Sequence, residues 1–340
     1  MKALVYSAPE KFSVIDVPTP EPHGTEVLIR VRACGLCKTD LHIHHGHFFS
    51  EFPLIPGHEF AGEVAAVGDA VTQVRVGDRV VADNERQCGV CEYCRRGESL
   101  FCESLYAQGV NAPGGFAEYV LVRQHQVYHL AEHISFTEAT LVEPTACAVH
   151  GMDVIRPSTG DTVLQFGAGP TGLLLAQLLR HGGAAEIVIA DLSPAKLALA
   201  ETYAGAKTLL VRRDDPQAHL REITALHPRG YNIVVDATGV SRVAESLPQF
   251  ARFGGKVVFY GVCPEEERIQ LSPYDVFRRE LKILGSFSQA HTFDRATRLV
   301  NAGVVQVKGM VTHAFPLEGW GDALRLVTEG RENIKIVITP

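Results

Sequence analysis

Short apolar strands alternate with helical segments from about residue 160 to residue 285, and this alternation constrains the fold more than any other feature. The run Thr162–Phe166 precedes an apolar helix over Leu173–Leu179, and Ile187–Asp191 precedes a helix that starts at Ser193 and Pro194. Further strands are predicted at Thr208–Val211, Ile233–Asp236, Lys256–Tyr260 and Lys282–Leu284. The repeated pattern predicts an α/β domain with a parallel, doubly wound sheet.

A glycine-rich turn joins the first strand of this region to the first helix. It has a Gly-x-Gly-x-x-Gly pattern made of Gly167, Gly169, Pro170, Thr171 and Gly172. Asp191 follows at the tip of the next strand, which completes the context of a dinucleotide-binding fingerprint. Gly167 permits the tight turn, Gly169 lets the backbone approach a pyrophosphate, and Gly172 lets helix and strand pack closely. Asp191 favours NAD over NADP because it would repel a 2′-phosphate; its alternative role is a helix N-cap.

The first part of the chain has the pattern of a β domain. Short runs bounded by glycine turns or by the stiff segment Pro18–Pro22 predict strands at Lys2–Tyr6, Glu26–Arg32, Gly62–Gly68, Gly77–Ala82 and Gly114–Val122. Ser135 and Glu138 form a capping box that predicts the start of a helix. We assign residues 1–150 to a barrel-like β domain, residues 151–287 to the doubly wound domain, and residues 288–340 to a C-terminal segment that ends in a strand over Asn333–Ile338.

Length and charge exclude several classes of protein. A chain of 340 residues favours two domains over one. The net charge of −7 and the absence of a Lys/Arg block argue against nucleic acid or an anionic membrane as a partner. The N-terminus has no apolar segment of a secretory signal, and no apolar run approaches the roughly 18 residues of a membrane span. We expect a cytoplasmic protein.

Four of the eight cysteines are packed into one short stretch: Cys88, Cys91, Cys94 and Cys102. Disulfides would require an oxidising compartment, for which the sequence gives no export signal. Overlapping Cys-x-x-Cys steps let thiolates converge on one ion, and four cysteines form a closed, structural zinc site. We predict a structural zinc lobe over about residues 86–104; unrelated thiols on a loop are the alternative.

A second set of metal-ligating residue types lies further toward the N-terminus. Cys37 stands on a predicted loop, and His58 and Glu59 follow about twenty residues later within Pro-Gly-His-Glu. A thiolate, an imidazole and a carboxylate suit Zn²⁺, and a catalytic zinc keeps one position open for water or substrate. Ordinary packing of an isolated Cys and His is the competing explanation. The residues that follow Cys37 are Thr39, Asp40 and His42.

Together these motifs resemble the zinc-containing medium-chain dehydrogenase/reductase family, whose signature includes Cys-x-(Ser/Thr)-Asp-x-His and a later Gly-His-Glu segment. The resemblance extends from the first strand to the last residues. It implies a partly open GroES-like β-barrel as catalytic domain, a Rossmann domain that binds NAD, and a C-terminal segment that rejoins the barrel. It also implies two zinc ions per chain, one catalytic and one structural, and a homodimer or homotetramer.

The resemblance further implies a ligand set for the catalytic zinc. Alcohol dehydrogenases of the family often supply a second cysteine where this chain has Glu143 and Pro144, as in the sorbitol dehydrogenase-like branch. Cys37, His58 and a carboxylate are therefore expected around the metal. Glu59, Glu143 or a water held by one of them completes the set.

Roles for other residues follow from the same resemblance. The zinc is a Lewis acid that stabilises the alkoxide of an alcohol while hydride leaves for nicotinamide. Thr39 and His42 are expected to relay the hydroxyl proton to solvent, and Asp40 to orient His58. Lys196 is expected beside the ribose, with a solvated helix face as its alternative. Residues expected on the nicotinamide side are Thr238, Gly261, Val262, Ser286 and Phe287.

The substrate expected from this branch is a polyol. We interpret His44, His45 and His47 as a substrate-entrance loop, because a tetrahedral metal site is already supplied elsewhere. Ser288 and Gln289 replace the Arg and Tyr that tend to follow Phe287 in sorbitol dehydrogenases, so the particular polyol is not specified. We expect an NAD-dependent enzyme that reversibly oxidises a secondary hydroxyl of a polyol to the ketose. The alternatives are a dehydrogenase of butanediol, threonine or a simple alcohol, a non-catalytic NAD-binding protein, and a zinc-free reductase.

Overall fold

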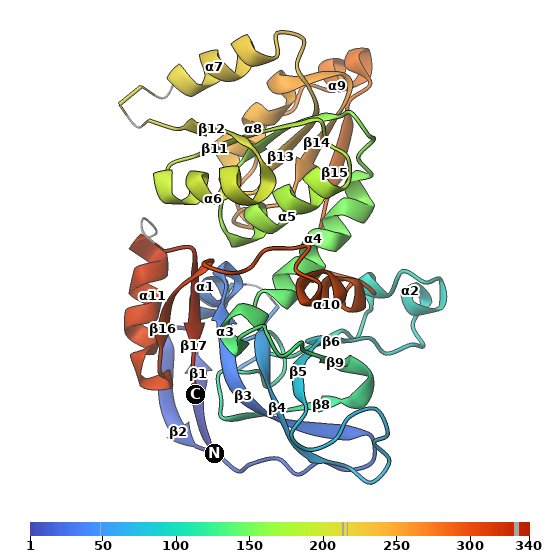
Figure 1. Cartoon of the computed structure of the whole chain (residues 1–340), viewed down its shortest axis with the longest axis vertical. Helices are drawn as coiled ribbons and strands as arrows, with labels where there is room; N and C mark the ends of the chain where they lie inside the picture. The colour runs from blue at the N-terminus through green and yellow to red at the C-terminus, as the bar shows by residue number, and fades with distance from the viewer. Residues whose placement is uncertain (48, 213, 216, 330–332) are drawn as a thin grey trace. The chain divides into compact units, whose positions relative to one another are not determined.

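The structure, a computed structural model, describes residues 1–47, 49–212, 214–215, 217–329 and 333–340. The chain forms two compact units. Figure 1 shows the elements of both, coloured by residue number along the chain. Unit 1 consists of Met1–Ala146 and Ala290–Pro340, and unit 2 of Cys147–Gln289. Within the described ranges, every helix is too short or too polar to cross a lipid bilayer.

The main sheet of unit 1 has the strand order β16-β17-β3-β4-β5-β9, and β8 pairs with β3. Its strands are β3 (Glu26–Leu36), β4 (Glu59–Val67), β5 (Arg79–Ala82), β8 (Tyr119–Arg123), β9 (Val127–His129), β16 (Val311–Phe315) and β17 (Lys335–Ile338). Strand β3 alternates buried and exposed side chains in its middle and is wholly buried at its end. The segment that includes β16 and β17 thus joins the N-terminal sheet, which confirms the prediction that the C-terminal segment rejoins the first domain.

Smaller elements surround this sheet. The further strands are β1 (Lys2–Ala8), β2 (Lys11–Asp16), β6 (Glu85–Arg86) and β7 (Tyr106–Ala107). The helices are α1 (Lys38–His44), α2 (Glu92–Arg95), α3 (Phe136–Ala139), α4 (Val142–Ile155, which continues into unit 2), α10 (Phe293–Asn301) and α11 (Trp320–Glu329), with short 3₁₀ turns η1 (Ser99–Phe101), η2 (Gln124–Gln126) and η3 (Leu317–Gly319). Tyr6, Phe116 and Trp320 are fully buried, and the Trp320 indole donates a hydrogen bond to the Tyr6 hydroxyl. These aromatic rings tie β1 and α11 to the core of the sheet.

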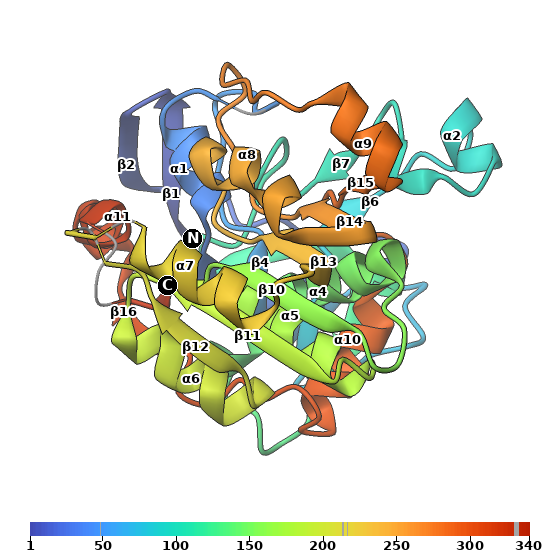
Figure 2. The same cartoon turned by 90° about the horizontal axis from the view of Figure 1, so that it is seen from above.

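Unit 2 is a six-stranded parallel sheet of order β12-β11-β10-β13-β14-β15. The strands are β10 (Thr162–Phe166), β11 (Glu186–Asp191), β12 (Lys207–Leu210), β13 (Tyr231–Asp236), β14 (Ala251–Phe259) and β15 (Lys282–Gly285). The helices are α5 (Pro170–His181), α6 (Pro194–Ala204), α7 (Ala218–Leu226), α8 (Ser241–Phe250) and α9 (Pro273–Arg279). Helices α7 and α8 pack on one face of the sheet, and α5 and α6 cover the other (Figure 2). This confirms the doubly wound prediction.

The helix start predicted at Ser135 and Glu138 is confirmed, whereas one local prediction was wrong, for an identifiable physical reason. The stretch after Cys37 was interpreted as a loop, but Asp40 caps its first turn and Lys38–His44 forms α1. The helix that begins after Ser135 ends at Ala139, and α4 begins separately at Val142. The hydroxyl of Thr140 donates to the Thr137 carbonyl at 2.7 Å, and such local bonds compete with helix continuation. Strand β2, which is exposed along most of its length, has no apolar pattern and was missed.

Candidate active site

The end of β3 and the start of β4 bring three side chains of metal-ligating type together. Cys37 follows β3 directly, His58 precedes β4, and Glu59 is its first residue. Because Gly35 lies opposite Glu59 in this antiparallel pair, the three residues meet at one end of the two strands. One ligand atom from each residue lies within 4.8 Å of the other two. His58 and Glu59 are buried, and Cys37 is half-buried.

Asp40 lies against this group from the first turn of α1. Its Oδ2 accepts the Cys37 N–H at 2.8 Å, and its Oδ1 lies 3.8 Å from His58 Nδ1. That separation is too long for a hydrogen bond, and both atoms are buried without a hydrogen-bond partner. Burial raises the pKa of Asp40 to about 6, against the opposing charge of His58. Burial also lowers the pKa of His58, but Asp40 and Cys37 outweigh it, so the pKa of His58 lies well above its usual value.

The group fits a zinc ion with three protein ligands. Sulfur, nitrogen and oxygen donors are those that zinc takes in catalytic sites. Since Nδ1 of His58 faces Asp40, the other ring nitrogen, Nε2, is left for a metal. A histidine bound through Nε2 carries its proton on Nδ1 and donates it to a carboxylate in many metal sites. The two unpartnered atoms, His58 Nδ1 and Asp40 Oδ1, are the pair that such a site uses.

Lys335 completes the surroundings of Glu59 and was not predicted. It lies on β17, which pairs with the end of β3, and its ammonium forms an ion pair with Glu59 Oε2. The two side chains are only 3% and 1% exposed. Burial lowers the pKa of Lys335, but Glu59 and Cys37 raise it beyond its ordinary value, so the lysine is protonated. The sequence signal was a single lysine within the apolar run Ile334–Ile338, since a buried ammonium requires an anionic partner.

Gly35 creates the space in which this ion pair lies. A Cβ at position 35 would overlap Glu59 Oε2 and would lie 2.7 Å from Lys335 Cε. Any side chain here would therefore displace the ion pair. The glycine is required by the close approach of two side chains, not by its backbone conformation.

The remaining residues predicted for this site are the alternative ligand Glu143 and the relay residues Thr39 and His42. Glu143 is buried on α4 and is outside the group of three, although its charge raises the pKa of both His58 and Lys335. Thr39 Oγ1 lies 3.7 Å from Cys37 Sγ. His42 is half-buried three residues further along α1, on the same helix face as Thr39. Cys147, near Glu143 in sequence, is half-buried on α4.

The cysteine lobe forms a second metal-ligating group. The sulfurs of Cys88, Cys91, Cys94 and Cys102 all lie within 4.8 Å of one another. The backbone N–H groups of Val90 and Cys91 donate to Cys88 Sγ at 3.5 and 3.3 Å, and they lower the pKa of Cys88 to about 6. Gly89, with φ of 73°, permits the turn that directs these N–H groups at the sulfur. Four converging sulfurs fit a closed zinc site.

The glycine turn of unit 2 lies between β10 and α5. Gly167 has φ of 102°, and a Cβ on Gly172 would lie 2.6 Å from the Gly167 carbonyl oxygen. A Cβ on Gly169 would meet no atom within 4 Å, so the turn is open on that side. Pro170 and Thr171 are the first two residues of α5. A tight turn that opens at a helix N-terminus fits the pyrophosphate of a dinucleotide.

Asp191 lies at the end of β11, one strand away from this turn. Its Oδ2 accepts the Ala168 N–H at 2.7 Å, and its Oδ1 accepts the Ser193 N–H at 2.8 Å. The N-cap of α6 is Ser193, whose hydroxyl accepts the Lys196 N–H at 3.4 Å. Asp191 is therefore held beside the glycine turn, and the alternative role as N-cap belongs to Ser193. Lys196 is half-buried in the first turn of α6.

The remaining predicted cofactor residues follow the carboxyl ends of β13, β14 and β15: Thr238, Gly261, Val262, Ser286 and Phe287. Buried Asp236 holds the first of these loops by accepting the N–H and hydroxyl of Thr238 at 2.8 and 2.6 Å. Val262 and Phe287 are 56% and 45% exposed, and the Ser286 hydroxyl is buried without a partner. Parallel α/β sheets bind their ligands at this edge.

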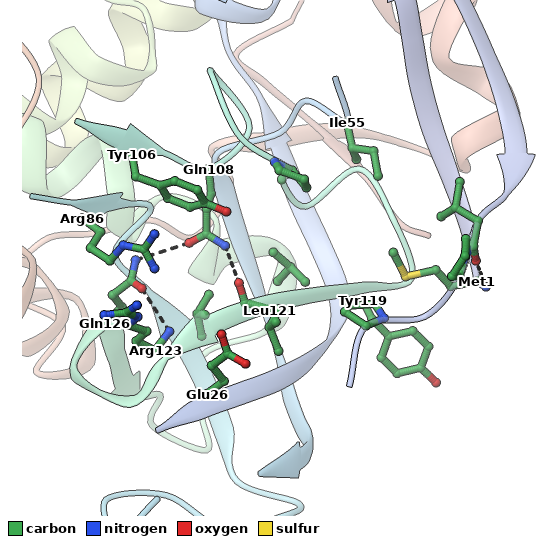
Figure 3. Close-up of a pocket in the computed structure, with 17 residues that line it drawn as sticks. Met1, Glu26, Ile55, Arg86, Tyr106, Gln108, Tyr119, Leu121, Arg123 and Gln126 are labelled. Atoms are coloured by element: carbon green, nitrogen blue, oxygen red, sulfur yellow. Dashed lines mark hydrogen bonds between the residues drawn. The ribbon is translucent and has the colours of Figure 1, made fainter. Parts of the chain in front are cut away.

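A separate pocket of about 340 Å³ lies on the barrel unit (Figure 3). Its walls include Gln108 and Gln126, which bond to each other and, through Gln108, to the Leu121 carbonyl. Arg86 and Arg123 lie at its edge. None of Cys37, His58 and Glu59 lines it, and we assign it no role in the chemistry.

Comparison with protein families gives two matches. Residues 23–132 match the alcohol dehydrogenase GroES-like domain, and residues 170–302 match the zinc-binding dehydrogenase family. The first match lies within unit 1, and the second covers most of unit 2 and extends past its end at Gln289 to residue 302.

Individual relatives extend over nearly the whole chain. D-arabinitol dehydrogenase 1 of Uromyces fabae is 42% identical over 341 residues, which cover 100% of this chain and 97% of the relative. D-altritol 5-dehydrogenase of Agrobacterium fabrum is 36% identical, with 93% of each chain covered. The crystal structure of a zinc-binding dehydrogenase from Sinorhizobium meliloti 1021 bound to NADP superimposes with a TM-score of 0.92, at 33% identity, and covers 100% of this chain and 99% of its own.

Proposed function

Because this chain belongs to the zinc-containing medium-chain dehydrogenase/reductase family, we propose that it is an NAD-dependent polyol dehydrogenase that reversibly oxidises a secondary hydroxyl to a ketone. The observation that carries the proposal is the buried group of Cys37, His58 and Glu59, with one sulfur, one nitrogen and one oxygen within 4.8 Å of one another. The names of two relatives, an arabinitol and an altritol dehydrogenase, support a sugar alcohol as substrate.

The three residues of this group are proposed as the ligands of the catalytic zinc. Glu59 is favoured over Glu143 because only its carboxylate lies within ligand distance of both Cys37 and His58. Zinc bound there supplies a Lewis acid that lowers the pKa of a substrate hydroxyl, and NAD supplies the acceptor for hydride. Asp40 is proposed to orient His58, because its Oδ1, 3.8 Å from Nδ1, would accept a hydrogen bond from the Nδ1 proton once a small closure brings the two atoms together.

Thr39 and His42 are proposed to carry the hydroxyl proton away. The Thr39 hydroxyl accepts the proton of the substrate and passes its own to His42, which releases it to solvent because imidazole titrates near neutral pH. The Thr39 hydroxyl lies 3.7 Å from the Cys37 sulfur, so it borders the proposed metal site. His42→Ala is expected to slow oxidation most at low pH, where solvent base is scarce. Retention of the wild-type pH–rate profile would remove His42 from the relay.

NAD is proposed as the cofactor, bound with its pyrophosphate at Gly169 and Pro170 and its adenosine ribose at Asp191. The carboxylate of Asp191, anchored by two backbone N–H groups, repels a 2′-phosphate. Asp191→Ala is expected to shift the ratio of kcat/KM for NAD and NADP toward NADP. An unchanged ratio would show that another residue, such as Lys196, reads the ribose. Asp161→Ala, on the same unit but before β10, is the matched control.

A substrate panel tests the class of alcohol. With NAD, turnover of four- to six-carbon polyols is expected to exceed turnover of butanediol, threonine and simple alcohols. Good turnover of threonine or butanediol without any polyol would replace the proposal by that alternative. Metal analysis tests the class of protein: two zinc ions per chain are expected, whereas zinc only in the cysteine lobe would indicate a non-catalytic NAD-binding protein.

We further propose a cytoplasmic homodimer or homotetramer. The support is the ordinary acidic composition, with a net charge of −7, and the oligomers found among members of the family. Light scattering of the purified protein distinguishes dimer, tetramer and monomer, and fractionation of the source cells tests the compartment.

A further inference from the structure

In place of the substrate-entrance role expected for His44 and His45, we propose a third metal site in unit 1, formed by these two residues and Glu10. It binds a divalent transition-metal ion such as Zn²⁺ and joins the end of α1 to the turn between β1 and β2. One ligand atom from each of the three residues lies within 4.8 Å of the other two. None of them belongs to the two groups described above. Two imidazoles and one carboxylate are a ligand set that zinc, nickel and copper ions take from proteins.

The backbone holds the two segments together without the help of a metal. The Glu10 N–H donates to the His44 carbonyl at 2.8 Å, and Glu10 has φ of 62°, which few residues other than glycine adopt. Gly46 lies so close to the turn that a Cβ there would be 2.7 Å from Pro9 Cγ. Figure 2 shows α1 beside β1 and β2. The ligands are therefore brought together by the fold itself, so little ordering is left for metal binding to supply.

The His44 ring is positioned by the aromatic core. Its Nδ1 lies 2.9 Å from the Tyr6 hydroxyl, which also accepts the Trp320 indole N–H at 2.8 Å. The ring packs edge-on against Tyr6, with centroids 5.8 Å apart, and lies 6.0 Å from the Phe12 ring. With Nδ1 engaged by the hydroxyl, Nε2 is the ring nitrogen left for a metal. A ligating histidine whose other nitrogen bonds to an oxygen is the common arrangement in metal sites.

The other two ligands face solvent, so an ion can reach the site. His45 Nδ1 lies 3.3 Å from Glu10 Oε1, and the side chains are 51% and 66% exposed. The His44 and His45 rings are 4.9 Å apart in an edge-to-face arrangement. The site lies at the opposite end of α1 from Cys37, roughly 10 Å along a helix of this length.

Zinc counting in matched variants tests the proposal. Wild-type enzyme, dialysed against excess Zn²⁺ and analysed for bound metal, is expected to hold one zinc per chain more than His45→Ala. Glu10→Gln is expected to weaken binding of that additional ion at least about tenfold. Both side chains are exposed, so neither variant threatens the fold. His129→Ala is the control, because His129 is an exposed histidine that lies 3.9 Å from a carboxylate, that of Asp78, but belongs to none of the three groups.

The outcomes separate a built site from general surface binding. The proposal is supported if the additional ion is retained in His129→Ala and lost in His45→Ala, and if Zn²⁺ raises the melting temperature of the wild type but not of His45→Ala. Equal zinc counts in wild type and His45→Ala would overturn it. Loss of the additional ion from His129→Ala as well would also overturn it, because the ion would then not be specific to this group.

Discussion

Unit 1 contains two groups of buried or half-buried metal ligands that are built in opposite ways. Cys37, His58 and Glu59 lie at the ends of two central strands, and the sheet fixes their positions. The four cysteines lie on a loop whose one helix, α2, has four residues and no buried side chain. The first group offers three ligand atoms, and its Glu59 forms an ion pair with a buried lysine. The second offers four sulfurs, which accept hydrogen bonds from backbone N–H groups. The difference predicts that the sheet holds the first group in place without a metal, whereas the position of the four cysteines would depend on a bound zinc ion.

Removing one cysteine from each group should give the largest and most divergent effects. Cys37→Ser is expected to lower kcat/KM for a polyol more than about 100-fold, because a ligand is lost where even a supporting contact is worth 10–100-fold in metal affinity. NAD binding, measured by fluorescence titration, should persist. Cys94→Ser is expected to retain kcat but to bind one zinc ion fewer per chain. The backbone amides of the lobe should also lose their protection from hydrogen exchange, because the free energy of zinc binding stabilises the folded lobe. If the two variants behaved alike, the contrast between the groups would be wrong.

Lys335→Met is expected to have the next largest effect. Removing the ammonium leaves the Glu59 carboxylate buried without a counter-charge, and breaking one side of a buried ion pair costs about 3–5 kcal/mol. The free energy of unfolding in urea, measured on zinc-free protein, is the readout. The double variant Glu59→Gln with Lys335→Met should recover most of the loss, because neither member of this pair is then left charged without its partner. Lys2→Met, which removes one partner of the exposed Lys2–Glu318 pair, should change nothing measurable.

Gly35→Ala tests whether the sheet alone sets the position of Glu59. The added Cβ would overlap the Glu59 carboxylate, and such overpacking costs about 1–3 kcal/mol. Both stability and zinc affinity should fall. Gly97→Ala in the lobe is a contrasting glycine, since a Cβ there would meet nothing within 4 Å. Because Gly97 has φ of 79°, alanine at this position is expected to destabilise the lobe through backbone strain, while zinc affinity at Cys37, His58 and Glu59 stays unchanged. Unchanged zinc affinity in Gly35→Ala would show that Glu59 can move freely.

The smallest effect is expected from Asp40→Asn. Loss of the carboxylate that faces His58 Nδ1 should weaken binding of the catalytic zinc about 10–100-fold, with little change in the lobe zinc. The time course of zinc transfer to a chelator is the measurement, with one rate expected for the catalytic zinc and another for the lobe zinc. Asp69→Asn is a suitable control, because Asp69 also accepts a backbone N–H, from Gly24 at 3.0 Å, but lies outside both metal groups. Equal chelation rates for Asp40→Asn and wild type would contradict the orienting role.

The sequence predicted the parts of the molecule whose signals are local. The glycine turn, the strands of unit 2 and the four cysteines each occupy a short stretch, so spacing alone predicts what they form. Fold class and family are confirmed by the structure and the relatives. The ligand assignments remain predictions, although the fold does bring Cys37, His58 and Glu59 together.

What could not be predicted depends on pairing between distant strands. Lys335 contacts Glu59 only because β17 pairs with β3. A glycine is needed at position 35 only because the side chains of Glu59 and Lys335 lie against it. The choice between Glu59 and Glu143 likewise depends on where β4 and α4 direct their carboxylates. The cluster of Glu10 with His44 and His45 depends on a turn that lies against the end of a helix. No spacing rule contains these contacts, because they arise from tertiary structure.

The position of Lys335 on β17 also has a consequence for biosynthesis. At a translation rate of about 5–20 residues per second, this lysine is made roughly 15–55 s after Glu59. Until then the nascent barrel presents the unpaired edge of β3 at that end of the sheet, with an acidic side chain lacking its cation. The ribosome must therefore complete the whole nucleotide-binding unit before the barrel can close around its catalytic centre. The strand that completes this end of the sheet is therefore made among the last residues of the chain.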